Sequence, residues 1–471
     1  MNNKALEEDI QRIIESRHNQ PQSVLGPHYM EKEKLLIIRI FHPHAKEVHI
    51  QRKTKPYTKY KMEKIHEDGL FEAKIEKVRQ AFKYKVIYTF QDGNTYTTHD
   101  PYAFKEPEFT EFDRYLFLNG KHYKLFEKFG AHPMVKDGVK GVNFILWAPN
   151  AQRVSVVGPF NLWDGRIHQM MLLDESGIWE LFIPDLGEAE VYQYEMKIEG
   201  DIIFKKTDPF SFYTAYEPLR GGVIRLPWEK YRWKDEKWMK DAKKENSWKL
   251  PLNIYKMDVS KEPLDDLLIK RIKDEGYNYI ELSPYMGDKI DSFFSPNTMK
   301  CIPEELMTFI DRCHNNNIGL ILTSIPSIIS EEAKEMTFYD GTRLYEYEDT
   351  TINKPKFNHE RKEVRSFLIS NSMFWMEKYH FDGVNIDPAH VKMYKEALEE
   401  EGDVLKDMKV IANGTITERS VSEEEIKRIV EVRHSDPHSI LGPHKLMDGN
   451  VSVRTFYPGA KDIYLLLEGT P

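Results

Sequence analysis

The chain has 471 residues, of which 40% are hydrophobic and 12% aromatic, so it can fill several folded cores and is not an intrinsically disordered chain. A chain of this length is expected to form about three domains. The formal net charge is -9 and no long basic run occurs, which argues against nucleic acids and anionic membranes as partners and favours a neutral ligand.

The N-terminal stretch, residues 1–17, is polar and acidic and lacks the apolar segment of a secretory signal. Since no run of roughly 18 apolar residues occurs, no membrane-spanning helix is predicted and a cytoplasmic location is expected. The spacing of Cys301 and Cys313 fits neither a zinc motif nor a disulfide framework, so we expect two reduced core thiols. No metal or other cofactor is predicted.

Short runs of alternating apolar and polar residues fill the first half of the chain, with turn-forming residues between them. Four of these runs are residues 36–41, 154–157, 179–183 and 192–196. Such alternation is typical of antiparallel strands with one buried face. The sequence therefore predicts two immunoglobulin-like β-sandwiches of roughly a hundred residues each, over residues 1–110 and residues 111–227.

The first of these modules recurs late in the chain. Its Leu-Gly-Pro-His block at residues 25–28 returns at residues 441–444, and the flanking positions keep an almost constant offset. Because such self-similarity indicates a duplicated structural unit, residues 419–471 are predicted to form an incomplete repeat of the first sandwich. The pair Asp100-Pro101 likewise returns as Asp208-Pro209 in the second module.

A connector rich in Trp and Lys, residues 228–250, leads to a region in which strands alternate with helices. This alternation predicts a parallel sheet with right-handed crossovers. One helix is expected to begin at Pro303, and an earlier one to place on its core face Leu264, Leu267, Leu268 and Ile272. Only about five strands are recognisable, whereas a closed barrel needs roughly 250 residues, so residues 251–418 are predicted to form a partial (β/α)8 TIM-type barrel.

Several motifs then carry a family resemblance. Residues 147–151 (Trp-Ala-Pro-Asn-Ala), 160–165 and 177–184 resemble the glycogen-binding-type β-sandwich that precedes the barrel of bacterial glycogen branching enzymes, which are members of the alpha-amylase superfamily. Residues 339–346 and 363–368 resemble the start of the branching-enzyme barrel, in the same order. The resemblance implies retaining transfer of a glucosyl chain from an α-1,4 to an α-1,6 linkage. Such chemistry needs two carboxyl groups about 5 Å apart, one as nucleophile and one as general acid and base.

The resemblance also assigns positions to the catalytic residues. Asp387 matches the nucleophile, but Asn385 stands where the family has the arginine that holds this carboxylate ionised and oriented. Asn413 stands at the position of the general acid. Because an amide has no titratable proton for the leaving sugar, a contribution of roughly 10²- to 10⁴-fold is expected to be lost. The resemblance therefore implies a hexosyltransferase, yet this copy is expected to lack most of the family's catalytic residues.

Two aromatic residues are candidate sugar contacts. Phe294 matches the tyrosine that stacks under the reacting sugar in the family, with the ring kept and the hydroxyl lost. Trp163 follows Asn161 in a loop-like stretch and could stack on a glucose face. Trp179 alternates with core residues and is expected to be buried. The tryptophans of the connector, Trp228, Trp233, Trp238 and Trp248, are expected to pack it onto the barrel.

Asp387 and Asn413 could also have purely structural roles. Asp387 precedes Pro388, which suits the first position of a helix, so its side chain is also predicted to cap that helix. Asn413-Gly414 fits an ordinary turn at the end of a strand.

The leading hypothesis is a catalytically impaired, branching-enzyme-like protein of glycogen metabolism that acts by binding α-glucan. One alternative is an active 1,4-alpha-glucan branching enzyme. Another is a non-enzymatic assembly domain or a fragment of a tandem branching enzyme. The expected ligands are glycogen or amylose-like chains, and the further partners considered are an intact branching enzyme and a second copy of this chain.

Overall fold

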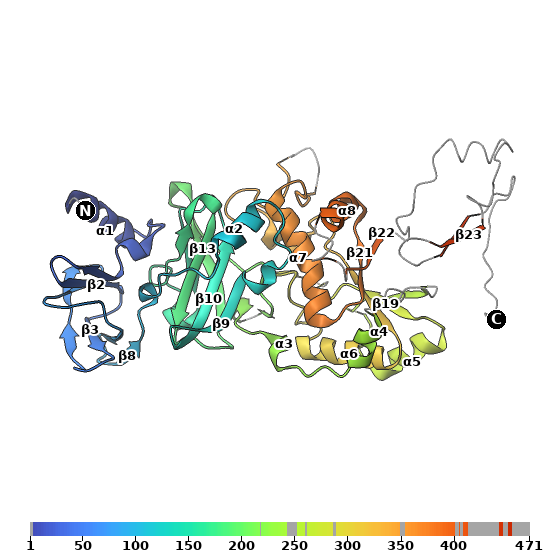
Figure 1. The fold of residues 1–471 in the computed structure, drawn as a ribbon, viewed down its shortest axis with the longest axis horizontal. Coiled ribbons are helices and arrows are strands. Elements are labelled where there is room, and N and C mark those ends of the chain that lie inside the picture. Colours follow the sequence, from blue (N-terminus) through green and yellow to red (C-terminus); the bar gives the residue numbers. More distant parts are fainter. Residues whose placement is uncertain are drawn as a thin grey trace.

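The computed structural model describes residues 3–216, 218–242, 252–259, 261–285, 289–348, 354–400, 405, 408–412, 442–445 and 451–454. Two β-rich parts and one α/β part follow one another along the long axis of the molecule (Figure 1). The first β-rich part holds the N-terminus at one end, and the second lies between it and the α/β part.

The first β-rich part is a sandwich of two four-stranded antiparallel sheets with the helix α1 (Asn3–Ile14) beside it. One sheet has the order β1 (Gly26–Met30), β2 (Leu35–Phe41), β6 (Leu70–Ile75) and β5 (Glu63–His66). The other has the order β4 (Lys59–Lys61), β3 (Glu47–Arg52), β7 (Tyr84–Thr89) and β8 (Thr95–Thr98). Strand β7 buries every second residue, as expected of a strand with one face on a core.

The second β-rich part is also a two-sheet antiparallel sandwich, as predicted. One sheet has the order β12 (Met171–Leu173), β13 (Ile178–Pro184), β10 (Val139–Trp147) and β9 (Gly130–Lys136). The other has the order β11 (Arg153–Val157), β14 (Val191–Lys197), β17 (Gly221–Val223) and β16 (Thr214–Ala215), with β15 (Ile203–Lys206) also paired to β14. Trp179 on β13 is fully buried and donates its indole N–H to the carbonyl of Ala148 at 2.9 Å, which confirms its predicted burial.

The α/β part contains a parallel sheet, as the alternation of strands and helices predicted. Its order is β18 (Ile254–Lys256), β19 (Tyr279–Leu282), β20 (Gly319–Thr323), β21 (Gly383–Ile386) and β22 (Val410–Ala412). The helices between the strands are α5 (Asp266–Asp274), α6 (Pro303–Asn315), α7 (Lys362–Tyr379) and α8 (Val391–Glu400). Within the described residues the sheet is five-stranded and open, with β18 and β22 at its edges.

Helices α5 and α6 can be compared with the helices predicted from the sequence. Helix α6 begins at Pro303 as expected, and the buried free thiols Cys301 and Cys313 lie just before it and within it. In α5, by contrast, the prediction for Leu267 is wrong, because this side chain is 77% exposed while Leu268 and its neighbour Ile269 are buried. The buried face of α5 is thus rotated toward Ile269 relative to the predicted face, because packing against the sheet decides how the helix is oriented about its axis.

The connector packs onto the α/β part, as predicted, through the helices α3 (Pro227–Lys230) and α4 (Glu236–Ala242) and the segment between them. Trp233 stacks on His380 with ring centroids 3.8 Å apart, and Trp238 stacks on His314 at 5.1 Å. Trp228 packs edge-on against Phe374. Trp248 lies outside the described residues.

The second sandwich and the α/β part share one hydrophobic core, which also includes Phe41, Leu70 and Tyr102 of the first sandwich. The remaining interior of the first sandwich is a separate cluster. Phe210 of the sandwich stacks on Phe294 with ring centroids 4.5 Å apart. The backbone N–H of Asn150 donates to the carboxylate of Asp340 at 3.0 Å across the same boundary. These two parts therefore form one packed unit.

The repeated Asp-Pro pairs have the same structural role in both sandwiches. The hydroxyl of Tyr84 donates to Asp100 at 2.5 Å, and the hydroxyl of Tyr192 donates to Asp208 at 2.6 Å. Each carboxylate also accepts a backbone N–H from the residue two positions further along the chain. The sequence repeat therefore reflects a repeated hydrogen-bond arrangement.

Two strands of the predicted C-terminal repeat are described, β23 (Gly442–Lys445) and β24 (Val451–Arg454). They pair antiparallel with Gly442 opposite Arg454, which is the register of Gly26 opposite Arg39 in the first sandwich. The rest of residues 419–471 lies outside the described part. Among the helices that the structure describes, none has the length and apolar character needed to cross a membrane.

Candidate functional site

The carboxyl ends of the parallel strands carry a row of polar side chains centred on Glu281. One carboxylate oxygen of this buried residue accepts hydrogen bonds from the Thr323 hydroxyl and from the Asn385 amide N–H, both at 3.0 Å. The same oxygen lies 3.4 Å from the ammonium of Lys256. Four neighbouring strands, β18 to β21, therefore contribute one residue each. In open α/β sheets, ligands bind outside this edge.

The sequence assignments did not include Glu281, although its place at the end of a buried strand was a usable signal. Asn385, the predicted substitute for an arginine, points at Glu281. Its second polar atom, Oδ1, is buried and has no hydrogen-bond partner among the described residues. The amide of Asn385 therefore supplies a hydrogen bond to a buried carboxylate on β19, two strands away in the sheet.

Asp387 follows directly after β21 and caps the short 3₁₀ helix of residues Pro388–His390, as predicted. One carboxylate oxygen accepts the backbone N–H of Ala389 at 2.9 Å, and the other accepts the N–H and the hydroxyl of Ser327 at 2.9 and 3.1 Å. Burial alone would raise the pKa of Asp387, but these hydrogen bonds outweigh it and hold the pKa below its usual value. The carboxylate of Asp387 is therefore ionised near pH 7, and each of its two oxygens accepts at least one hydrogen bond.

His390 lies beside Asp387 and is fully buried. Burial lowers the pKa of His390 to about 4, despite the nearby Asp387 charge, so the ring is neutral near pH 7. Its ring lies 5.3 Å from that of His359, centroid to centroid. Neither Asp387 nor His390 therefore holds a proton that it would release readily near neutral pH, as a general acid must.

The structure does not support the predicted sugar contact of Phe294. This side chain has no exposed surface and is enclosed by Phe210, Phe367 and Phe374 in the core shared with the second sandwich. A ring packed in this way has no free face for a sugar. The sequence could not reveal this, because Phe210 lies in another module. Asn413, the residue at the general-acid position, lies outside the described residues.

Trp163 lies in the loop after β11 of the second sandwich and is half-buried. The ammonium of Lys205 lies 5.5 Å from the centre of its ring and donates a hydrogen bond to its carbonyl at 3.3 Å. The neighbouring Leu162 is 73% exposed. Trp163 is therefore at the surface of the sandwich, far along the chain from the carboxyl edge of the parallel sheet.

Two known sequence families match the β-rich parts of the chain. The sequence family described as the N-terminal domain of the alpha-1,4-glucan branching enzyme GlgB matches residues 6–102 and again residues 422–471. Carbohydrate-binding module 48, described as the isoamylase N-terminal domain, matches residues 128–211, the greater part of the second sandwich.

Relatives that match most of this chain are named as branching enzymes. The 1,4-alpha-glucan branching enzyme GlgB of Trichormus variabilis is 33% identical over 453 residues, which cover 84% of this chain and 58% of the relative. The enzyme of the same name from Gloeobacter violaceus is 35% identical over 424 residues, with 84% and 57% covered. The chain thus spans somewhat more than half the length of these relatives.

Among solved structures, type I pullulanase from Bacillus subtilis in complex with maltose has a TM-score of 0.49 at 14% identity, covering 85% of this chain and 62% of that one. The chain thus contains the N-terminal domain found in the branching enzyme GlgB and a family 48 carbohydrate-binding module, and it is similar to bacterial 1,4-alpha-glucan branching enzymes over the residues that it shares with them.

Proposed function

We propose that this chain is an α-glucan-binding protein of glycogen metabolism with little or no glucosyl-transfer activity of its own. The observation that carries the proposal is the state of Asp387. Both oxygens of its carboxylate already accept hydrogen bonds from Ser327 and from the backbone N–H of Ala389. These bonds, all to neutral donors, give the carboxylate a structural role as a helix cap, and they supply none of the positive charge that the family's arginine would place beside a nucleophile.

The surroundings of Asp387 support the same proposal. The family resemblance implies an arginine at position 385, where the charge would hold the nucleophile. The Asn385 present there is neutral and hydrogen-bonded to Glu281. His390 is kept neutral by burial, and the resemblance puts an amide, Asn413, at the general-acid position. Retaining transfer needs a nucleophile and a proton donor together, so losing either one stops the reaction.

Glucan binding is supported by the second sandwich. This module matches a carbohydrate-binding family, and Trp163 presents an indole ring at its surface. Flat aromatic rings fit the apolar face of a pyranose. The low net negative charge and the lack of a basic run are consistent with a neutral polysaccharide as ligand.

Two assays on the purified chain test the proposal. In the first, the chain is incubated with amylose, and new α-1,6 branches are measured from the chain lengths released by a debranching enzyme. We expect no new branches. Branch formation that disappears in Asp387→Ala would overturn the proposed lack of transferase activity and would support an active branching enzyme.

The second assay measures co-sedimentation with glycogen. We expect the chain to bind, and Trp163→Ala to weaken binding about tenfold, which is the usual effect of removing an aromatic anchor. Tyr115→Ala is the matched control, since Tyr115 is a 62% exposed ring at the edge of the same part of the chain. If the unmodified chain does not sediment with glycogen, the binding half of the proposal is wrong.

A further inference from the structure

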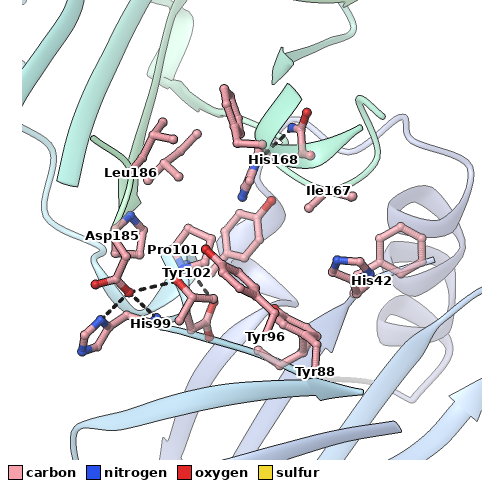
Figure 2. A pocket seen from close by; sticks show the side chains of 18 of the residues that line it. His42, Tyr88, Tyr96, His99, Pro101, Tyr102, Ile167, His168, Asp185 and Leu186 are labelled. Carbon is pink, nitrogen blue, oxygen red and sulfur yellow. Dashed lines mark hydrogen bonds and ion pairs between the residues drawn. The ribbon is translucent and has the colours of Figure 1, made fainter. Parts of the chain in front are cut away.

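One cavity in the described part of the chain lies between the two sandwiches, apart from the α/β part that holds Asp387. It has a volume of about 570 Å³, within the range of about 300–1,000 Å³ that is typical of small-molecule sites. The first sandwich contributes Tyr88, Tyr96 and Tyr102, and the second contributes Phe160, Ile167 and His168. Figure 2 shows Tyr88 and Tyr96 on one side of this pocket and Ile167 and His168 on the other.

The polar groups of the pocket include two imidazole rings that burial keeps neutral. Burial lowers the pKa of His42 to about 4 and that of His168 to about 3. The amide N–H of Asn161 donates to Nδ1 of His168 at 3.0 Å, which leaves the ring proton on Nε2. Nδ1 of His42 is buried and has no hydrogen-bond partner among the described residues. The pocket therefore offers neutral hydrogen-bonding groups beside aromatic rings.

The two acidic residues of the pocket already have partners. Asp185 accepts hydrogen bonds from the ring and backbone N–H of His99 at 2.8 and 2.9 Å and from the hydroxyl of Thr98 at 3.0 Å (Figure 2). Asp100 is buried and accepts from Tyr84. No Lys or Arg occurs among the described lining residues. An anionic ligand would therefore lack a counter-ion here, whereas a neutral ligand would not need one.

Aromatic faces combined with neutral donors and acceptors suit a molecule that has an apolar face and a rim of hydroxyl groups. A pyranose has both features, because its ring hydrogens form the apolar face and its hydroxyls can donate and accept. A purely apolar ligand would leave the buried Nδ1 of His42 without a hydrogen bond, which costs free energy.

We propose that this pocket binds glucose units of a short α-glucan and that the bound glucan links the first sandwich to the second. The inference rests on the proposed function and adds to it a glucan site distinct from Trp163. Most of the interior of the first sandwich is a separate cluster, although Phe41, Leu70 and Tyr102 belong to the core of the second sandwich. Polar contacts also flank the pocket, such as His44 with Asp164 at 2.9 Å. A ligand that touches both walls would add contacts across this boundary.

The test uses the full chain and calorimetric titration with maltotriose and maltoheptaose. We expect saturable binding that Tyr96→Ala weakens at least tenfold. Tyr96 is 53% exposed, so its truncation leaves the fold intact, and Tyr57→Ala is the matched control because Tyr57 is 62% exposed on the same sandwich and does not line the pocket. Ile167→Trp, which fills the pocket from the other wall, is expected to reduce binding as well.

The outcomes separate this inference from the proposed function. Glycogen binding that depends on Trp163, together with oligosaccharide binding that is unchanged in Tyr96→Ala and Ile167→Trp, overturns the pocket inference and leaves the proposed function standing. A chain that binds neither glycogen nor oligosaccharide overturns both. Cellobiose binding as tight as that of maltotriose also overturns the inference, since the site would then not select the α-linkage.

Discussion

The side-chain amide of Asn385 donates a hydrogen bond at 3.0 Å to the carboxylate of Glu281, which lies 104 positions earlier in the chain. The donor is on β21 and the acceptor on β19, so the bond spans the intervening strand β20. Thr323 of β20 donates to the same oxygen. At this edge of the sheet, one buried carboxylate is therefore surrounded by two neutral donors and the ammonium of Lys256.

Replacing Asn385 by Asp should destabilise the protein at pH 7 and much less at acid pH. Two carboxylates would then lie about 3 Å apart and could not both ionise freely, at a cost of about 1–3 kcal/mol. The variant's stability relative to the unmodified chain should recover at acid pH, because one of the two carboxyls then carries a proton that it can donate to the other. Urea denaturation at pH 7 and pH 5 measures this.

Asn385→Ala is the control for the charge effect. It removes the hydrogen bond without adding a charge, so its stability loss should be similar at both pH values. Equal losses for the Asp and Ala variants at pH 7 and at pH 5 would contradict the prediction.

Removing the cap at Asp387 should lower stability even though no substrate is present. Asp387→Ala is expected to cost about 1–2 kcal/mol, because the N–H groups of Ala389 and Ser327 lose their acceptor. Asp387→Asn should cost less, since Asn is also a good cap. Thermal unfolding of the two variants measures the difference. An Ala variant as stable as the unmodified chain would argue that the carboxylate is free for another role.

His314 should make the protein less stable as the pH rises above neutrality. Its ring lies between Asp235 at 2.8 Å and Asp382 at 3.2 Å. Burial by itself would lower the pKa of His314, but these two carboxylates raise it to about 9 from an ordinary value of 6.5. The stabilisation is complete below about pH 6.5 and is lost as the pH rises through about 9, and it amounts to about 3 kcal/mol.

The measurement is urea denaturation between pH 6 and pH 10. His314→Gln should remove most of the slope between pH 6.5 and pH 9, whereas His66→Gln, at the end of β5 in the first sandwich, should leave it unchanged. A profile for His314→Gln that matches that of the unmodified chain would show that another group titrates in this range.

Loss of the tyrosine hydroxyl should reduce stability more in the Tyr84–Asp100 pair than in the Tyr192–Asp208 pair. Tyr84→Phe removes the only side-chain hydrogen bond that the structure describes for Asp100, whereas Asp208 keeps a bond from Tyr194 at 3.2 Å after Tyr192→Phe. We therefore expect a cost of about 1–3 kcal/mol at Tyr84 and a smaller one at Tyr192.

The pH dependence of this effect has a definite sign. Burial raises the pKa of Asp100 to about 6, and losing the Tyr84 bond, which favours the charged form, should raise it further. The cost of Tyr84→Phe should thus be larger at pH 7.5 than at pH 5. Tyr96→Phe, an exposed ring on the adjacent strand β8, is the control and should show no loss at either pH. A larger cost at pH 5 would contradict this account.

Local patterns in the sequence were sufficient for the features that depend on neighbouring residues. Alternation predicted β11, β13 and β14 to within one residue at each end, because a strand with one buried face must alternate. The Asp387-Pro388 pair predicted a helix cap for the same kind of reason, since capping involves only the next few residues. The repeated motifs predicted a duplicated module because related sequences fold alike.

Other features were decided only when distant segments packed together. Leu267 was expected inside and is exposed, and Phe294 was expected at a sugar but is enclosed by Phe210 from another module. The hydrogen bonds of Glu281 and the pocket between the sandwiches join residues that no local period connects. The sequence by itself determined the kinds of element and their order along the chain. The tertiary structure alone decided which faces meet, because burial depends on contacts between residues far apart in the chain, and these contacts leave no local pattern.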